Sequence, residues 1–348
     1  MKQIKKLILL TLIFSTVYPG FSQTAQDWQN VLKLVPEKIE ENKRRIEAAK
    51  KAEQDRIAAE RKAEQDRIAA ERKAEQDRIA AERKAWVDRI AAEREAKLKV
   101  YRKDNTRYVE SMDSYFVKIP VSRAYEVMTT EVTQKLWKLV MGKNPSQYYI
   151  GEKYPVNNVS WIDCVIFCNK LSEKEGLTPC YSYNGTTDVS KWKLDSKKIE
   201  KMKDDKRKAF FEAFDSAMVC NFDASGYRLP TKDEWKSAAS HYFIVGTRDN
   251  DNIDDVAWYR DNSKFEAHEV ATKKSNDYGL YDMYGNVEEW CWNKEEEKRY
   301  GKPDYGVRFI CGGDYCDDKS QLIKADWSES YLYNAWPTKG LRLVRTVE

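Results

Sequence analysis

An eleven-residue repeat constrains this chain more than any other feature of its sequence. Residues 51–83 are three identical copies of KAEQDRIAAER, and residues 84–94 are a fourth copy, KAWVDRIAAER. The repeat consists largely of strong helix formers, and no glycine or proline lies between Pro36 and its end. Pro36 itself suits the first turn of a helix. The sequence therefore predicts one α-helix from Pro36 to Tyr101, about 100 Å long at about 1.5 Å per residue.

The repeat lines up alanines rather than isoleucines along one face of this helix. These alanines step alternately by seven and four residues: Ala52, Ala59, Ala63, Ala70, Ala74, Ala81, Ala85, Ala92 and Ala96. Eleven residues in three turns give a right-handed drift, as in a right-handed coiled coil. An alanine face buries little area, however, and pairs such as Glu53 with Arg56 support a solitary helix. Self-association through residues 36–101 and a solitary helix both stay open, and either makes the segment a spacer.

The first residues have the pattern of a cleaved secretory signal. Lys2, Lys5 and Lys6 precede an apolar run from Leu7 to Val17, and small residues follow before Gln23. We expect a signal peptide at 1–22, a short linker at 23–35, and a mature chain that is exported to the periplasm, the cell envelope or the medium. No other segment reaches the length of a transmembrane span. Charges are interspersed and sum to only +4, which disfavours a nucleic-acid partner.

The cysteines fit an exported chain. There are seven, and in an oxidising compartment thiols are more often paired than free. Because seven is odd, at least one is unpaired or bridges two chains. Cys180 and Cys220 lie at the two ends of a segment, 192–218, that has the composition of a basic amphipathic helix. They are suited to a disulfide across its base, although sequence alone proves no connectivity.

Residues 102–348 have the composition of a folded domain, with short elements and clear helix starts. Thr231 and Glu234 form a capping box, Ser160 with Asp163 opens another helix, and Thr133 opens a third. The phenylalanines of segment 192–218 indicate that this helical insertion packs on the core rather than on lipid.

Six separated motifs between residues 115 and 346 resemble the formylglycine-generating enzyme family, whose shared unit is the sulfatase-modifying factor domain. The motifs are YEVMTTEVTQKLWKLVMGKNPS, PVNNVSWIDCVIFCNKLSEKEGLTPCYSY, SGYRLPTKDEWKSAA, NDYGLYDMYGNVEEW, CGGDY and GLRLVRT. The resemblance implies an α+β fold, a variant of the C-type lectin fold with small antiparallel sheets and much irregular backbone. It also implies that segment 192–218 is an insertion into the family fold.

The resemblance also raises copper chemistry. Active family members oxidise a substrate cysteine to formylglycine with two cysteines, five residues apart, that bind Cu(I), and soft thiolates suit that ion. Cys311 and Cys316 have this spacing but are shifted: Cys311 precedes the Gly-Gly pair in place of an arginine, and Asp314 replaces a serine. We rank disulfide bonding of these two, with Cys291 as a further candidate partner, above a copper site.

Calcium is the metal that the resemblance favours. The family binds it at the stretch matching Gly285, Asn286, Val287 and Glu289, through backbone carbonyls of the glycine and valine and the carboxylate. The alternative is that Asn286 and Glu289 satisfy buried backbone groups without a metal. Glu288 departs from the family, which has tryptophan at this position.

A binding or scaffold role is the leading interpretation. The resemblance places the family's substrate cleft at the CGGDY stretch and at the KADWSESYLYNAWP stretch. The expected ligand-cleft residues are Asp314, Tyr315, Trp327, Tyr331, Tyr333 and Trp336. We expect a non-catalytic envelope module on a helical spacer, with a protein or glycan ligand. The alternative is a divergent copper thiol oxidase that acts on a protein cysteine through Cys311 and Cys316.

Overall fold

The computed structural model describes residues 25–239, 253–293, 306–324 and 327–347. The predicted signal peptide, 1–22, lies outside these ranges. Contacts divide the chain after Ala85 into two compact units. None of the helices in the described ranges is both long enough and apolar enough to cross a membrane.

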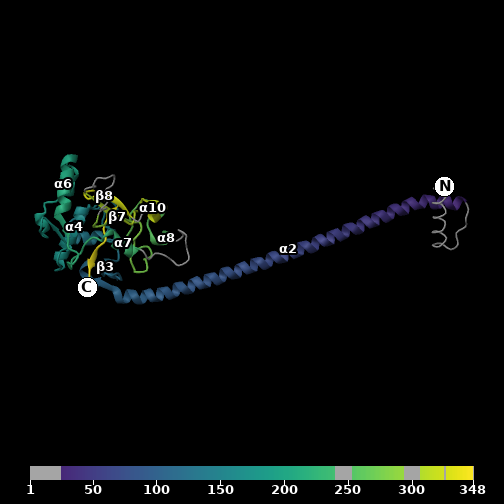
Figure 1. Cartoon of the computed structure of the whole chain (residues 1–348), viewed down its shortest axis with the longest axis horizontal. Coiled ribbons are helices and arrows are strands. Elements are labelled where there is room, and N and C mark those ends of the chain that lie inside the picture. Colours follow the sequence, from purple (N-terminus) through teal and green to yellow (C-terminus); the bar gives the residue numbers. More distant parts are fainter. Residues whose placement is uncertain (1–24, 240–252, 294–305, 325–326, 348) are drawn as a thin grey trace. The chain divides into compact units, whose positions relative to one another are not determined.

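The repeats lie in one long helix, α2, which runs from Ala25 to Asn105 (Figure 1). The predicted long helix is thus confirmed, but it extends beyond the predicted range, Pro36 to Tyr101, at both ends. Residues 25–35, which we expected to be a linker, are helical, and Pro36 lies inside the helix rather than in its first turn. The segment AQDWQNVLKLV contains no glycine or proline to stop the helix before Pro36.

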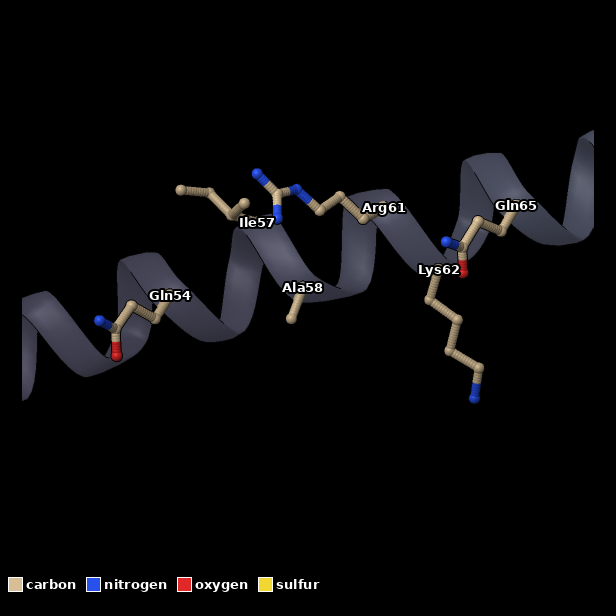
Figure 2. Close-up of a pocket in the computed structure, with 6 residues that line it drawn as sticks. All are labelled: Gln54, Ile57, Ala58, Arg61, Lys62 and Gln65. Carbon is tan, nitrogen blue, oxygen red and sulfur yellow. The ribbon is translucent and has the colours of Figure 1, made fainter.

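Ion pairs recur along α2 with the period of the repeat. Arg56 donates to Glu53 at 2.7 Å, as predicted, and the equivalent pairs of the next two repeats, Arg67 with Glu64 and Arg78 with Glu75, are 2.8 Å long. Figure 2 shows side chains of two successive repeats leaving this helix in different directions, so that they line an open surface and not a cavity.

In the described residues of the unit that follows, three sheets form the framework. One has the strand order β1-β2-β3-β10, a second pairs β4 with β5, and a third has the order β8-β7-β6-β9. The strands are β1 Thr106–Val109, β2 Ser114–Ile119, β3 Tyr125–Met128, β4 Tyr181–Tyr183, β5 Met218–Cys220, β6 Glu288–Trp290, β7 Val307–Cys311, β8 Trp327–Tyr331, β9 Lys339–Gly340 and β10 Val344–Thr346. All pairings are antiparallel except that of β6 with β9.

Short helices and irregular backbone connect these strands. The α-helices are α3 Gln134–Met141, α4 Trp161–Lys174, α5 Ser196–Glu200, α6 Asp204–Ala217, α7 Lys232–Ala239, α8 Ile253–Val256, α9 Arg260–Ser263 and α10 Lys319–Lys324. Two 3-10 turns, η1 Glu110–Met112 and η2 Val189–Lys191, complete them. The three predicted helix starts are confirmed: Thr133 caps α3, Ser160 with Asp163 forms the capping box of α4, and Thr231 exchanges hydrogen bonds with Glu234 before α7.

The insertion is helical and docks on the core, but it is not one helix. A turn at 201–203 divides it into α5 and α6, and its last residue begins β5. Ile199, Phe211 and Phe214 are buried in the main core, as the phenylalanine cluster predicted. A buried ion pair between Asp215 and Arg308, 2.6 Å long, ties α6 to β7.

The third sheet lies between two apolar clusters and positions the candidate site. Trp290 and Ile310 belong to the main core, whereas their neighbours Cys291, Phe309 and Cys311 belong to a second cluster. This alternation follows from the two-residue side-chain period of β-strands. The loops that follow β6 and β7 therefore start from backbone that is fixed on both faces.

Candidate functional site

A mixed-charge cluster lies where β6, β9 and the turn after β7 meet. Glu288 pairs with Lys339 across the parallel β6/β9 ladder, and Lys339 Nζ lies 3.7 Å from Glu288 Oε2. The Ser328 hydroxyl donates to Glu288 Oε1 at 3.1 Å. Asp314 joins the cluster from the turn, where its carboxylate accepts from the Cys316 amide at 2.6 Å. We call Glu288, Asp314, Trp336 and Lys339 the Trp336 site.

Burial changes the proton affinities of these groups. Burial raises the pKa of Asp314 to about 7, and Asp317 and Glu288 add to the shift, while hydrogen bonds from the Cys316 amide and Thr338 oppose it. Burial also raises the pKa of Glu288, which the Lys339 charge partly offsets. The pKa of Lys339 is lowered by burial against the attraction of Glu288 and Asp314. The cluster thus combines one cation with carboxyls that titrate closer to neutral pH than exposed ones.

Trp336 brings this cluster to the surface. Its side chain is 59% exposed, and Lys339 Nζ lies 5.2 Å from its ring centroid and 5.3 Å from that of the buried Trp290. The Trp336 carbonyl accepts from the Asn158 amide at 2.9 Å, which anchors the loop. An exposed tryptophan over an ordered cationic side chain is a surface that a ligand can cover.

The expected cleft residues fall into two groups. Tyr315 is buried beside the Trp336 site and meets the Tyr149 ring edge-on at 5.9 Å. Tyr331 and Tyr333 stack on each other at 5.5 Å and continue toward the insertion, because Tyr333 also stacks on Phe211 at 5.8 Å. The backbone of Trp327 pairs with Cys311, but its side chain lies outside the described part of the structure.

The stretch expected to bind calcium is tightly bonded within the protein. Gly285 has φ of 76°, and a Cβ there would lie 2.1 Å from the Trp258 carbonyl oxygen, so only glycine fits. Asn286 donates to Glu131 at 2.8 Å, and Glu131 also accepts from the Val287 amide at 3.0 Å. The Asn286 side-chain amide, the Val287 backbone amide and the Glu131 carboxyl group therefore all have protein partners.

Glu289, the expected carboxylate ligand, has both oxygens engaged. Arg342 donates to them at 2.7 and 3.0 Å, and Trp235 Nε1 donates at 2.6 Å. Among the residues described, no three acidic, histidine or cysteine side chains form a group that could hold a metal ion. This arrangement does not fit a calcium ion unless Arg342 or Trp235 moves, so calcium stays a prediction from the resemblance.

The structure separates the two cysteines of the copper hypothesis. Cys311 is buried in the second apolar cluster, where its sulfur lies 3.5 Å from that of Cys291. Cys316 packs instead beside Tyr315 and Tyr149, and burial, together with Asp314 and Asp317, raises its pKa to about 11. The two thiols therefore lie in different surroundings, and Cys311 contacts Cys291 instead.

The other predicted thiol pair, Cys180 and Cys220, is offset by one residue in the β4/β5 pairing. Cys220 lies opposite Tyr181 in the β4/β5 pair, whereas Cys180 is one residue earlier and points the other way by the strand alternation. The Cys180 thiol donates to the Gly226 carbonyl at 3.3 Å. A bond between Cys180 and Cys220 stays a prediction that this register does not favour.

Sequence reasoning missed three charged residues of these sites. Lys339 lies outside the six motifs, and Glu131 and Arg342 were quoted only as parts of YEVMTTEVTQKLWKLVMGKNPS and GLRLVRT. Glu288 was noticed as a departure from the family, and the structure pairs it with Lys339. Asp314 and Trp336 were already expected cleft residues, and the departure at Glu288 was a further signal in the sequence that pointed to the Trp336 site.

Comparisons with known proteins agree with this fold. A family profile described as the sulfatase-modifying factor enzyme 1-like domain matches residues 97–347. Chaperone protein LppX of Paenibacillus barcinonensis is 33% identical over 262 residues, which cover 68% of this chain and 85% of that protein. Treponema denticola variable protein 1 has a solved structure that aligns with 70% of this chain and 98% of its own, at 29% identity and a TM-score of 0.56. The CarF structure is 27% identical, with a TM-score of 0.48, over 65% of this chain and 87% of its own.

Proposed function

This chain belongs to the sulfatase-modifying factor enzyme 1-like family, and on that premise we propose that it is an exported binding module without oxidase activity. In this proposal its ligand is a protein, bound over the Trp336 site, and α2 is a spacer that carries the domain. The predicted α+β fold of the family and the long helix are both present.

The exposure of Trp336 carries the proposal. Most tryptophans in the described domain are covered, and Trp161, Trp235 and Trp290 are among its largest fully buried side chains. Trp336 instead remains 59% exposed while its ring rests on a charged side chain that is itself held by Glu288. Aromatic residues are enriched at the centres of protein interfaces, where they supply large contact area at low entropic cost.

The arrangement of the thiols argues against the oxidase alternative. Two-thiolate binding of Cu(I) needs both sulfurs at one place and deprotonated. Here Cys311 and Cys316 pack in different apolar clusters, and burial together with the neighbouring carboxylates raises the pKa of Cys316. A binding role does not require these sulfurs to lie together or to be deprotonated.

The name of one relative supports a protein as the ligand. The protein from Paenibacillus barcinonensis is named a chaperone, and chaperones act on other proteins. The predicted secretory signal supports a location in the envelope or outside the cell. Export and the spacer role are both parts of this proposal, whereas self-association through residues 36–101 is not required by it.

Site-specific photo-crosslinking in cells tests the binding role. A photoreactive amino acid replaces Trp336 in the full chain, and the control replaces Tyr108, which is 47% exposed and lies on β1 of another sheet. We expect one discrete crosslinked protein from position 336 and none from position 108. Equal crosslinking at both positions, or none at either, contradicts the proposal.

Copper titration tests the alternative. The full chain is titrated anaerobically with Cu(I) against a competing chelator, with Cys316→Ser as the matched variant. We expect no tight binding in either protein. Tight binding that Cys316→Ser abolishes would instead favour the thiol oxidase.

A further inference from the structure

We propose that Cys291 and Cys311 form a disulfide that joins β6 to β7 beneath the Trp336 site, and that Cys316 stays a free thiol. The proposal rests on the export that the proposed function includes, because thiols persist in a reducing compartment. It selects one pair among the cysteines that the sequence left open.

The sheet register brings the two side chains together. Cys311 lies opposite Glu289 in the antiparallel β6/β7 pair, and Cys291 is two residues beyond Glu289. Residues two apart share a face, so both thiols point to the same side of the sheet. The Cys291 amide donates to the Phe309 carbonyl at 2.9 Å, which continues the pairing past the end of β6. The cysteines are diagonal neighbours, and their sulfurs converge to 3.5 Å.

Closing the bond requires the two sulfurs to approach each other. A disulfide has sulfurs about 2.04 Å apart, so the two atoms must approach by about 1.5 Å. Diagonal neighbours are typically farther apart at Cα than disulfides prefer, but strand twist shortens one of the two diagonals. The observed sulfur contact shows that these side chains already point at each other.

Burial indicates when the bond forms. Both side chains are fully buried, and burial, with Cys311 and Glu289 nearby, raises the pKa of Cys291 well above its usual range. In the native fold both thiols are buried out of reach of an oxidant, so oxidation takes place while the chain folds. The two thiols lose two protons and two electrons, and a disulfide-exchange protein that serves as oxidant is reduced to its dithiol form.

The bond would fix the geometry of the Trp336 site. Cys291 follows the strand that carries Glu288, and Cys311 precedes the turn that carries Asp314. That turn passes through Gly312 and Gly313 at φ of 95° and 68°, conformations in which glycine is unstrained. A covalent link between the strands limits the relative motion of the two carboxyl groups. The sequence separation of the cysteines is 20 residues.

Peptide mapping of unreduced protein tests the bond. The full chain is purified from the envelope fraction or the medium, denatured, alkylated without reduction and digested with trypsin. Cys291 lies in the peptide 275–294, and Cys311 lies with Cys316 in the peptide 309–319. We expect these peptides to be linked, with one alkylated cysteine in the second. Full alkylation of Cys291 in the exported protein overturns the proposal.

The variant Cys316→Ser decides which sulfur of the second peptide is bonded. We expect the linked pair to persist in Cys316→Ser and to disappear in Cys311→Ala. A link that is lost in Cys316→Ser shows that Cys316 is the partner, and the proposed pair is then wrong.

Refolding in a glutathione redox buffer separates this proposal from export. If the link forms in that buffer but the cellular protein is intracellular and reduced, then export has failed while the pairing stands. If the exported protein lacks the link, the pairing has failed while export stands.

Discussion

The guanidinium of Arg342 holds the carboxylate of Glu289 in the interior of the domain, with Nη2 2.7 Å from Oε1 and both side chains at most 1% exposed. Arg342 also donates to the carbonyls of Met128 and Tyr281 at 3.0 and 2.7 Å. One side chain thus ties β3, β6 and the loop before the Gly285 turn together.

Removing Arg342 should therefore destabilise the domain strongly. Arg342→Met leaves Glu289 buried without its cation, and breaking one side of a buried pair costs about 3–5 kcal/mol. The free energy of unfolding, measured by urea denaturation, should fall by about that amount. The double variant Arg342→Met with Glu289→Gln should recover part of the loss, because the charge of Glu289 is removed together with its partner; Glu131 and Asp282, which also face Arg342, limit the recovery. A loss below about 1 kcal/mol in the single variant would show that water reaches Glu289.

Much of the fold could be predicted from sequence because local signals agree with it. The capping pairs at Ser160 and Thr231 fix where helices begin, and the repeat fixes the long helix. The break at 201–203 was missed because the flanking residues share one amphipathic pattern. The partners Glu131, Lys339 and Arg342 were missed because they meet the site through contacts between distant segments, which spacing does not reveal.

The site around Asp314 should make stability depend on pH. Its pKa is raised to about 7 in the folded chain, so between about pH 4 and pH 7 the folded state binds a proton that the unfolded state has released. The contribution of Asp314 to the free energy of unfolding is therefore largest below about pH 4 and decreases as pH rises toward 7. The upper bound is about 4 kcal/mol, at about 1.36 kcal/mol per pKa unit.

The variant Asp314→Asn cannot ionise and should lose this part of the slope. Urea midpoints should match the wild type near pH 4 and exceed it near pH 8. The control Asp318→Asn changes an exposed acid whose pKa is lowered, and it should not gain stability at high pH. Parallel curves for Asp314→Asn and wild type would contradict the raised pKa. Glu288 and Asp317 have pKa values raised in the same direction, so some slope should remain.

Chelation distinguishes the two accounts of the stretch 285–289. Because Arg342 and Trp235 already occupy the Glu289 oxygens, we expect EDTA to leave the melting temperature unchanged. A fall that calcium restores, and magnesium does not, would confirm the calcium prediction from the resemblance and would require Arg342 to share its partner.

The insertion offers a test of docking. Asp215→Asn removes the charge partner of Arg308, which is 6% exposed and lies 4.7 Å from the Trp161 ring centroid. We expect a loss of about 3 kcal/mol in the free energy of unfolding, from the uncompensated buried cation. Asp205→Asn, which changes an exposed acid at the start of α6, should cost less than about 0.5 kcal/mol and serves as the control.

The side chains that the repeats expose on α2 determine whether the chain self-associates. The isoleucines Ile57, Ile68 and Ile79 are 39–53% exposed on α2, and the alanine face offers little area for a partner. Each intrahelical pair, such as Arg56 with Glu53, contributes about 0.2–0.5 kcal/mol to the solitary helix and is weakened by salt. We therefore expect the full chain to sediment as a monomer at micromolar concentration, and the helical circular-dichroism signal to decrease as sodium chloride rises to about 1 M.

A dimer that dissociates on substituting Ala63 and Ala74 with glutamate would confirm self-association through the alanine face instead. Arg61→Glu, at the end of the preceding repeat, changes a charge off that face, so it should leave such a dimer intact.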